Sequence, residues 1–476
     1  MTRQLGSITA IGGYLPLLRL DRAQAARSLR HFGLGGRQAG FRSIGGWDED
    51  ALTFAAEASR GLAHPAPARI GFASTSAPFF DRSHAGLVVD ALALPRTIRS
   101  ADVAGSRRCA NSLLLDMLLA GDDGLVAAGE RRPAKPGSPA HLAYGDGGSA
   151  VRTGLSGPAQ LIGWASHSHD LLDSYASHAH ATPYVSEERF ARDVGGAAII
   201  VPAILAACAM AGIDPSAIAQ AAVHEPLPAM WKDIAKRTGM TAPNHAATLF
   251  ASAGDLGAAH ALFALALALD AAQPGDHVLV AGFGSGCDAM VFRVDAPVPG
   301  AAAAAAMLAS GEVTADYVRF LSLSGAIDLD FGIRSEIEQK AQATVLERHG
   351  RDTIGFIGGR DSAGNVQFPK TPVPVRPGAA GRETLEDVRL ADLPATLKSV
   401  TSDRLNFTPD PPFWFGLVQF DNGARILMEL TDAGAGGFAV GDALQMRLRI
   451  KSFDKRRGMR TYFWKAAPAA RPQMEG

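Results

Sequence analysis

The 476-residue chain carries 46 Lys and Arg against 47 Asp and Glu, a formal net charge of −1. This balance excludes a global basic field for nucleic acid or an anionic membrane surface. Three widely separated cysteines argue against a disulfide scaffold or a cysteine zinc site, and fit a reducing cytosol. The first residues lack the apolar core of a signal peptide, and we expect no run apolar enough to span a membrane. The composition therefore predicts a cytoplasmic protein of two or three domains.

Residues 1–295 alternate short β-rich runs, glycines and helical patterns, which is typical of a layered α/β fold. In the first half, strands are expected over 69–75 and 124–130, with a helix over 83–94. The second half repeats this alternation, with helices expected over 195–213 and 251–272, a strand over 221–226 and a pair of strands over 277–294. We interpret the two halves, roughly 1–155 and 195–295, as variations on one βαβ arrangement.

Residues 296–350 interrupt this alternation. A proline and small-residue run over 296–307 predicts a linker, and helical patterns follow over 309–350. Beyond them, 413–430 predicts a β-hairpin around an Asp-Asn-Gly turn, and 444–451 and 459–466 predict further strands. Residues 351–476 therefore favour a small antiparallel barrel of the OB type.

A set of short motifs in residues 1–295 resembles the thiolase superfamily, nearest its ketoacyl-ACP synthase III and HMG-CoA synthase branch. Their order and spacing carry the resemblance: Asp48-Glu49-Asp50, the strand ending at Thr75, Gly145-Asp146-Gly147-Gly148, His224, Gly254-Asp255 and Gly282-Phe283-Gly284-Ser285-Gly286. The resemblance implies a five-layered αβαβα core, coenzyme A as substrate or thioester, and a homodimer. Residues 351–476 resemble the zinc-ribbon/OB-fold partners of acyl-CoA-handling thiolases, fused here to the chain. The ribbon's four cysteines are missing, so no metal is expected.

The stretch 101–121 leads from a strand end into an apolar helix, where the resembled enzymes keep a nucleophilic cysteine. Counted from Asp102, the nucleophile position falls on Arg107, and only a two-residue insertion would bring Cys109 into it. We favour the ungapped alignment, with Cys109 as a small buried residue and Ser106 as a helix N-cap rather than an activated hydroxyl. Arg107 could neutralise a substrate carboxylate or an enolate, or be held by a buried acid.

His224 matches the active-site histidine of the resembled family, which binds a thioester carbonyl or moves a proton. The alternative is a satisfied core histidine. Asp255 stands where ketoacyl synthases keep an asparagine, and it could act as a base or cap the helix beginning at Leu256. Gly284 and Gly286 either let the backbone approach a thioester or form a tight hairpin.

The phosphates of coenzyme A require cations, for which location favours Arg37 and Lys232, followed by Arg42, Lys236 and Arg237. Two His-x-His pairs over 167–180 are interpreted as solvated rather than metal-binding. Tyr175 and Tyr184 in the same region could line an acyl or aromatic pocket.

Two functional hypotheses follow. The first is a CoA-thioester-dependent acyltransferase, or an enzyme forming or cleaving carbon–carbon bonds by Claisen, retro-Claisen or aldol chemistry, with lyase activity as second choice. It would act on a β-keto or β-hydroxy acyl substrate without a cysteine acyl-enzyme, using His224 and Asp255, with acyl-CoA and a keto acid as partners. The second is a non-catalytic thiolase-like scaffold that binds acyl-CoA for a partner enzyme.

Overall fold

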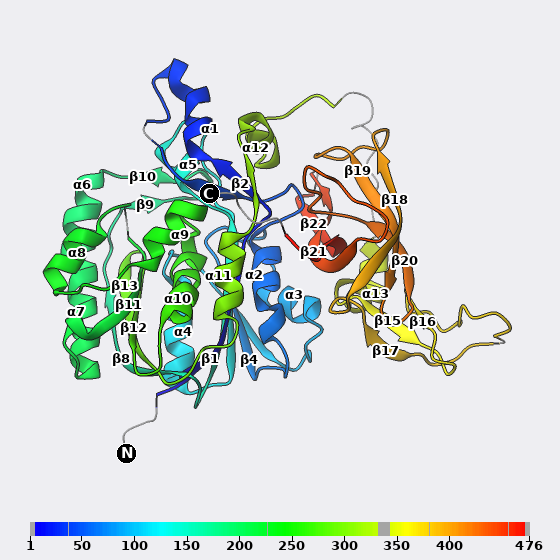
Figure 1. The fold of residues 1–476 in the computed structure, drawn as a ribbon, viewed down its shortest axis with the longest axis horizontal. Helices are drawn as coiled ribbons and strands as arrows, with labels where there is room; N and C mark the ends of the chain where they lie inside the picture. Colours follow the sequence, from blue (N-terminus) through cyan, green and yellow to red (C-terminus); the bar gives the residue numbers. More distant parts are fainter. Residues whose placement is uncertain are drawn as a thin grey trace.

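A nine-stranded mixed sheet organises the first 294 residues of the computed structural model (Figure 1). The structure describes residues 5–36, 38–225, 227–331, 343–379, 381–455 and 457–471. The sheet order is β11-β12-β13-β8-β1-β7-β6-β4-β5. Its strands are β1 (Ser7–Tyr14), β4 (Arg69–Ala73), β5 (Arg99–Val103), β6 (Gly124–Glu130), β7 (Gly147–Gly154), β8 (Ala159–Ser168), β11 (Ile218–Val223), β12 (His277–Phe283) and β13 (Gly286–Val294). The strands predicted over 69–75, 124–130 and 277–294 are confirmed.

Helices α4 (Cys109–Ala120) and α10 (His260–Ala271) form the central layer between the two halves of this sheet. Helix α10 is buried over ten of its residues, as its continuous apolar sequence requires. Helices α2 (Ala51–Ser59) and α3 (His84–Ala91) cover one outer face, and α7 (Val201–Ala211) covers the other. The layers therefore run helix, sheet, helix, sheet, helix, the predicted αβαβα order.

The outer helix layer contradicts the expectation that no run of the chain is apolar enough to span a membrane. Segments α6 (Glu188–Phe190), η3 (Ala191–Ile200) and α7 form one apolar helix, Glu188–Ala211, of 24 residues. An 18-residue window in it reaches a mean hydropathy of 2.2, so by length and composition it could cross a membrane. Half of that window is buried, and α7 packs on β8 and β13. A buried core helix passes the same test, because both environments select apolar side chains.

The predicted linker contributes to the core instead. Helix α11 (Ala301–Ala309) packs against β1, and β14 (Glu312–Thr314) pairs in parallel with β2 (Leu18–Asp21). Strand β2 also pairs with β3 (Phe41–Ile44). The remaining helices and strands before the C-terminal sheets are α1 (Arg22–Leu29), α5 (Pro139–Ala143), α8 (Trp231–Thr238), α9 (His245–Ala253), α12 (Tyr317–Leu323), β9 (Ser174–Tyr175) and β10 (Tyr184–Val185). Helix α13 (Ala343–Ile354) lies beside the C-terminal region, where it contacts β15 and β22 (Figure 1).

The C-terminal region holds two small sheets. The first has the order β16 (Val366–Gln367), β15 (Ile357–Arg360), β17 (Glu386–Arg389). The second has the order β20 (Arg425–Glu429), β19 (Phe413–Phe420), β18 (Ala395–Asp403), β21 (Ala443–Asp454), β22 (Met459–Pro468). The antiparallel β19–β20 pair confirms the predicted hairpin. A parallel bridge from Leu430 to Ala466 links the two edges of this five-stranded sheet.

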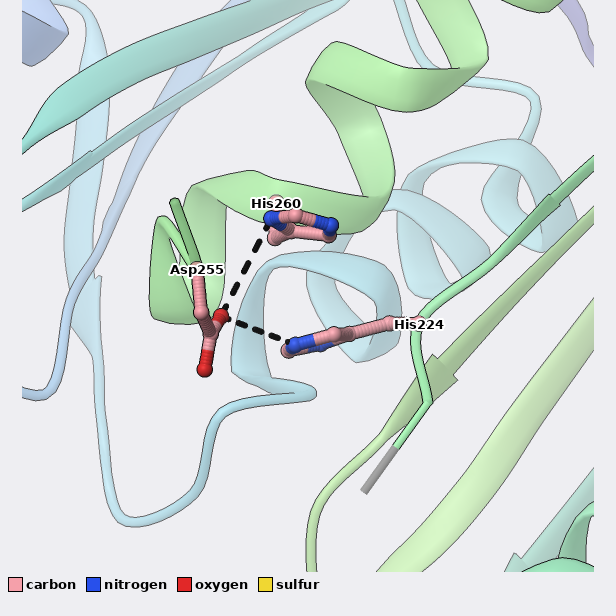
Figure 2. Close-up of side chains that lie close together, drawn as sticks. All are labelled: His224, Asp255 and His260. Carbon is pink, nitrogen blue, oxygen red and sulfur yellow. Dashed lines mark hydrogen bonds and ion pairs between the residues drawn. The ribbon is translucent and has the colours of Figure 1, made fainter. Parts of the chain in front are cut away.

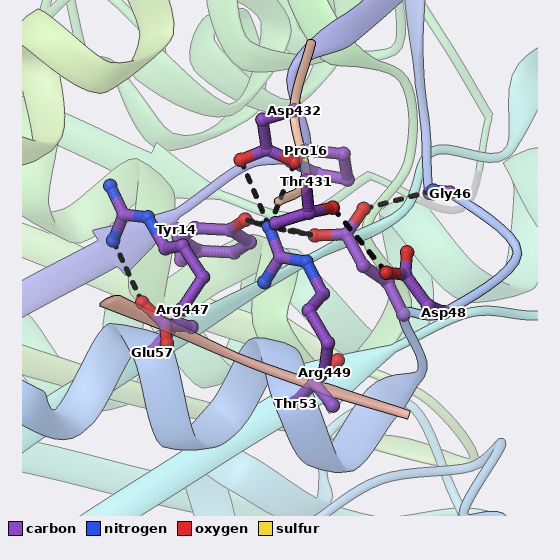
Figure 3. A network of polar contacts seen from close by, with 12 residues as sticks. Tyr14, Pro16, Gly46, Asp48, Thr53, Glu57, Thr431, Asp432, Arg447 and Arg449 are labelled. Atoms are coloured by element: carbon purple, nitrogen blue, oxygen red, sulfur yellow. Dashed lines mark hydrogen bonds and ion pairs between the residues drawn. The ribbon is translucent and has the colours of Figure 1, made fainter. Parts of the chain in front are cut away.

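Buried charges join the C-terminal region to the core (Figure 3). The fully buried Arg449 guanidinium donates to Asp432 at 3.0 Å and to the Tyr14 hydroxyl at 2.9 Å, and lies 3.1 Å from Glu49. Further buried contacts across the same interface are Arg447–Glu57 at 2.7 Å, Lys465–Asp48 at 2.8 Å and Tyr462–Asp50 at 2.8 Å. The Asp48-Glu49-Asp50 motif is thus a docking surface for the C-terminal region.

Candidate active site

The candidate site lies where β11 ends and the segment before α10 begins (Figure 2). His224 directly follows β11, and its backbone N–H continues the ladder by donating to the Ala281 carbonyl at 2.9 Å. Its Nε2 lies 2.9 Å from Asp255 Oδ1. The His224 Nδ1 atom is buried and has no hydrogen-bond partner among the residues that the structure describes. Because Nε2 faces a carboxylate, the proton belongs on Nε2 and the Nδ1 lone pair is left to accept.

Asp255 is held in its ionised form. Burial alone would raise its pKa, but Arg132 and His224 keep the pKa of this carboxyl well below its usual range. Arg132 Nη2 lies 2.7 Å from Asp255 Oδ2, and the guanidinium carbon lies 3.7 Å from the centroid of the Tyr144 ring. The Gly257 N–H also donates to Asp255 Oδ1 at 2.9 Å. Asp255 therefore accepts from the turn at Gly257, as the cap interpretation requires, and it also orients His224. Its interpretation as a base stays a prediction.

His260, the first residue of α10, stacks on His224 with ring centroids 4.6 Å apart. Burial, together with the neighbouring His224, lowers the pKa of His260 to about 3. Its Nδ1 lies 3.2 Å from the Leu256 N–H and its Nε2 lies 3.1 Å from the Ala246 carbonyl. His224, Asp255 and His260 offer ligand atoms within 4.8 Å of one another. Both nitrogens of His260 are engaged and Arg132 adds positive charge, so the cluster suits proton transfer better than a cation.

Cys109 opens the buried helix α4, but its surroundings disfavour a thiolate. Its side chain is buried, and burial together with the nearby Glu130 carboxylate raises the pKa of the Cys109 thiol. Glu130 itself is fully buried and accepts from Ser74 Oγ at 2.8 Å and from Thr75 Oγ1 at 2.6 Å. Burial first, and then the Glu130 carboxylate, outweigh the favourable helix N-terminus. Cys109 is therefore a protonated, buried thiol at neutral pH.

We expect iodoacetamide at neutral pH to alkylate Cys109 in the folded protein roughly 10²-fold more slowly than in the urea-unfolded chain. The physical reason is that only the thiolate reacts, and its fraction falls tenfold for each unit by which the pKa rises. Peptide mapping by mass spectrometry measures the rate, with Cys208 and Cys287, both buried, as internal references. Rapid labelling of Cys109 alone in the folded protein would contradict this description.

The turn before α4 differs from one sequence prediction. The N-cap of α4 is Arg108, without a side-chain cap bond, so the prediction that Ser106 caps this helix is wrong. Ser106 Oγ instead donates to the Gly284 carbonyl at 2.9 Å and lies 3.3 Å from the Arg108 N–H. Arg107 forms an ion pair with Asp173, whose side chain is largely buried, and its guanidinium carbon lies 5.7 Å from the centroid of the Phe283 ring. Of the roles considered for Arg107, the structure shows the buried acid partner.

Gly284 and Gly286 form the tight turn between β12 and β13. A Cβ on Gly284 would lie 2.9 Å from the Arg107 N, and one on Gly286 would lie 2.2 Å from the His167 carbonyl oxygen. Gly286 also has a φ of +124°. The hairpin interpretation therefore holds, because glycine is needed where the turn meets the chain around Arg107.

The side chains predicted to bind the phosphates of coenzyme A differ in their exposure to solvent. Lys232 is exposed on α8, whereas Arg42 is buried, 3.6 Å from Asp146, and points its guanidinium over the Phe320 ring. Arg42 is thus a core residue, and Arg37 lies outside the described residues. Tyr175 and Tyr184 face each other across the β9–β10 pair and are both exposed.

Sequence reasoning missed four residues of this site: Arg132, Glu130, His260 and Asn111. A signal existed for the first two, because Gly129-Glu130-Arg131-Arg132 places charges directly after a buried strand. Asn111 is a polar residue in the first turn of α4, a helix that is apolar over most of its length. His260 sits five residues after Asp255, but only the short turn between them brings its ring onto His224.

Comparison with known proteins agrees with this architecture. The family profile for the 3-oxoacyl-[acyl-carrier-protein (ACP)] synthase III C terminal matches residues 208–294, which contain His224, Asp255 and Gly284. Hydroxymethylglutaryl-CoA synthase of Aeropyrum pernix is 28% identical over 268 residues, which cover 53% of this chain and 74% of the relative. The corresponding synthase of Pyrobaculum neutrophilum is 26% identical over 350 residues, which cover 68% of this chain and 98% of the relative.

A crystal structure of an HMG-CoA synthase complexed with CoA superimposes with a TM-score of 0.53 and 17% identity, over 63% of this chain and 84% of that one. The chain therefore has the mixed α/β thiolase-like fold that its motifs predict. The sequence relatives and the family profile support the thiolase-like superfamily as its class. A condensing reaction on CoA thioesters fits this class.

Proposed function

We propose that this protein is a CoA-thioester-dependent condensing enzyme that forms a carbon–carbon bond by Claisen-type chemistry without a cysteine acyl-enzyme. The observation that carries the proposal is the buried Arg132–Asp255–His224 chain, which leaves His224 Nδ1 as an unengaged base. The raised pKa of the Cys109 thiol argues against a cysteine acyl-enzyme. A base of this kind removes an α-proton from an acyl thioester, and Asp255 stabilises the resulting imidazolium. A β-keto or β-hydroxy acyl group is the proposed substrate or product.

The scaffold hypothesis has one specific observation in its favour. Arg107, in the ungapped nucleophile position, is neutralised by Asp173 beside the glycine turn. Against it stands the unengaged Nδ1 of His224, which the buried Arg132–Asp255 pair orients and for which a protein without chemistry has no use. Arg132 and Asp255 both have largely buried side chains.

The proposal is tested by α-proton exchange. Purified protein is incubated in D₂O with acetyl-CoA or acetoacetyl-CoA, and deuterium at the α-carbon is followed by mass spectrometry, together with condensation products. We expect exchange with the wild type and a loss of about 10²–10⁴-fold in His224→Gln. His31→Gln changes an exposed histidine remote from this chain of residues and serves as the matched control. No exchange, no product and no thioester binding by the wild type would overturn the proposal.

The proposal extends to the surroundings of the site. The order β20-β19-β18-β21-β22, with the parallel bridge Leu430–Ala466, supports an OB-type barrel. Lys232 is our proposed contact for the coenzyme A phosphates.

Strand β5 is an exposed edge of the large sheet, which supports a homodimer formed by strand pairing. The three free cysteines support a cytoplasmic location.

A further inference from the structure

Asn111 is a fully buried amide in the first turn of α4. Within the described part of the chain, neither its Oδ1 nor its Nδ2 has a hydrogen-bond partner. An unpaired buried amide is costly, and most buried polar groups in folded proteins are satisfied. An orphaned donor and an orphaned acceptor on one side chain therefore require an explanation, and a bound ligand supplies one.

The fold makes room for this side chain. A Cβ added to Gly282 of β12 would lie 2.3 Å from Asn111 Cγ and 2.6 Å from its Oδ1. Any larger residue at position 282 would displace the amide. Glycine at position 282 therefore lets the Asn111 amide of α4 lie directly against β12, the strand next to β11.

His224 shares the layer into which Asn111 projects. The His224 N–H bonds to the carbonyl of Ala281, which places His224 level with Gly282 on the adjacent parallel strand. Side chains alternate along these strands: Ala222 and Val280 belong to the core around α4 and α10, whereas Val223 and Ala281 belong to the opposite core. Gly282 and His224 therefore face α4 and α10, and the stacking of His224 on His260 of α10 agrees. Asn111 and His224, which both carry buried polar atoms without a partner among the described residues, therefore face the same helical layer.

Resting on the proposed function, we propose that Asn111 is a catalytic residue that binds the thioester oxygen of the substrate. The α-carbon–hydrogen bond breaks, its proton passes to His224 Nδ1, and its electron pair moves into the enolate. The enolate oxygen accepts a hydrogen bond from Asn111 Nδ2. Asp255 cannot fill this role, because it is an anion and carries no donor. Nothing is oxidised or reduced. On quenching, the proton returns from His224 to the α-carbon. On condensation with a second acyl thioester, the new carbon–carbon bond replaces the carbon–sulfur bond of that thioester, and the proton goes to the released CoA thiolate.

The test is Asn111→Leu, which keeps the volume and removes both polar atoms. We expect α-proton exchange with acetyl-CoA to fall about 10²–10³-fold, the usual cost of losing an oxyanion donor. The melting temperature should stay the same or rise, since an unpaired amide is removed. This opposite movement of activity and stability separates a ligand-binding amide from a structural one. Asn111→Ser retains a hydroxyl donor and should lose less activity than Asn111→Leu.

Asp116→Asn, an exposed change on the same helix, is the matched control and should leave exchange unchanged. Calorimetry supplies a second readout: Asn111→Leu should weaken acetoacetyl-CoA binding about tenfold and leave CoA binding unaltered. Wild-type exchange and wild-type binding in Asn111→Leu would overturn the assignment of Asn111 and leave the proposed function intact. If the wild type itself neither exchanges nor binds either thioester, the proposed function fails, and this assignment fails with it.

Discussion

Replacing Asp255 by Asn is expected to lower the rate of α-proton exchange by about 10²–10⁴-fold while thioester binding changes little. The carboxylate now accepts from His224 Nε2 at 2.9 Å, which leaves Nδ1 without a proton. An asparagine amide can donate to Nε2 instead, which moves the ring proton to Nδ1. His224 would then present a donor at the atom that has to accept.

The same change removes the counter-ion of Arg132, 2.7 Å away. Removing one partner of a buried ion pair costs about 3 kcal/mol, and Glu130, 3.7 Å from Arg132 Nε, compensates only part of this loss, so Asp255→Asn should also unfold at lower urea concentration. The double variant Asp255→Asn/Arg132→Met should recover stability without recovering exchange. A wild-type exchange rate in Asp255→Asn would show that Asp255 only caps the turn at Gly257.

Acid titration gives an independent readout of Asp255. Its folded-state pKa lies below the unfolded value of about 3.9, so its contribution to stability is present above that pH and is lost as the pH falls. Asp255→Asn should flatten the loss of stability below about pH 4. Urea midpoints measured across this pH range, for the wild type and the variant, provide the comparison.

Arg449→Met should lower the free energy of unfolding by about 3–5 kcal/mol. The substitution leaves Glu49 and Asp432 facing each other in a buried interface without the guanidinium that lies within 3.1 Å of both (Figure 3). Arg447 and Arg471 offset part of the charge on Asp432, which keeps the loss within this range.

Urea unfolding followed by tryptophan fluorescence measures the effect, because Trp47 and Trp464 report on the two sides of the interface. In the wild type we expect one transition, since the two parts share a hydrophobic core containing Phe72 and Trp464. Arg425→Met, an exposed change in β20, should stay within about 0.5 kcal/mol of the wild type. Equal stability of Arg449→Met and Arg425→Met would contradict a structural role for the buried network.

Much of the fold follows from short-range patterns. Glycine punctuation and strand-length apolar runs predicted β4, β6 and the β12–β13 pair, and the Asp-Asn-Gly turn predicted the β19–β20 hairpin. The linker predicted over 296–307 is wrong, because a run of small residues has no hydrophobic periodicity that distinguishes a linker from a helix such as α11. Only packing against β1 makes that run a helix of the core.

The site residues likewise divide into those that the sequence predicts and those that only the tertiary structure shows. His224 and Asp255 could be named from motif spacing, since each lies at a strand end or helix start of a repeated unit. The partners that give them their chemistry, Arg132 on Asp255 and Asn111 beside Gly282, lie more than 100 residues away along the chain and meet them only through the sheet order. The charge state of Cys109 likewise depends on Glu130 and on burial. Residue type and spacing are local properties, whereas pKa values and orphaned hydrogen bonds arise from neighbours that tertiary packing supplies.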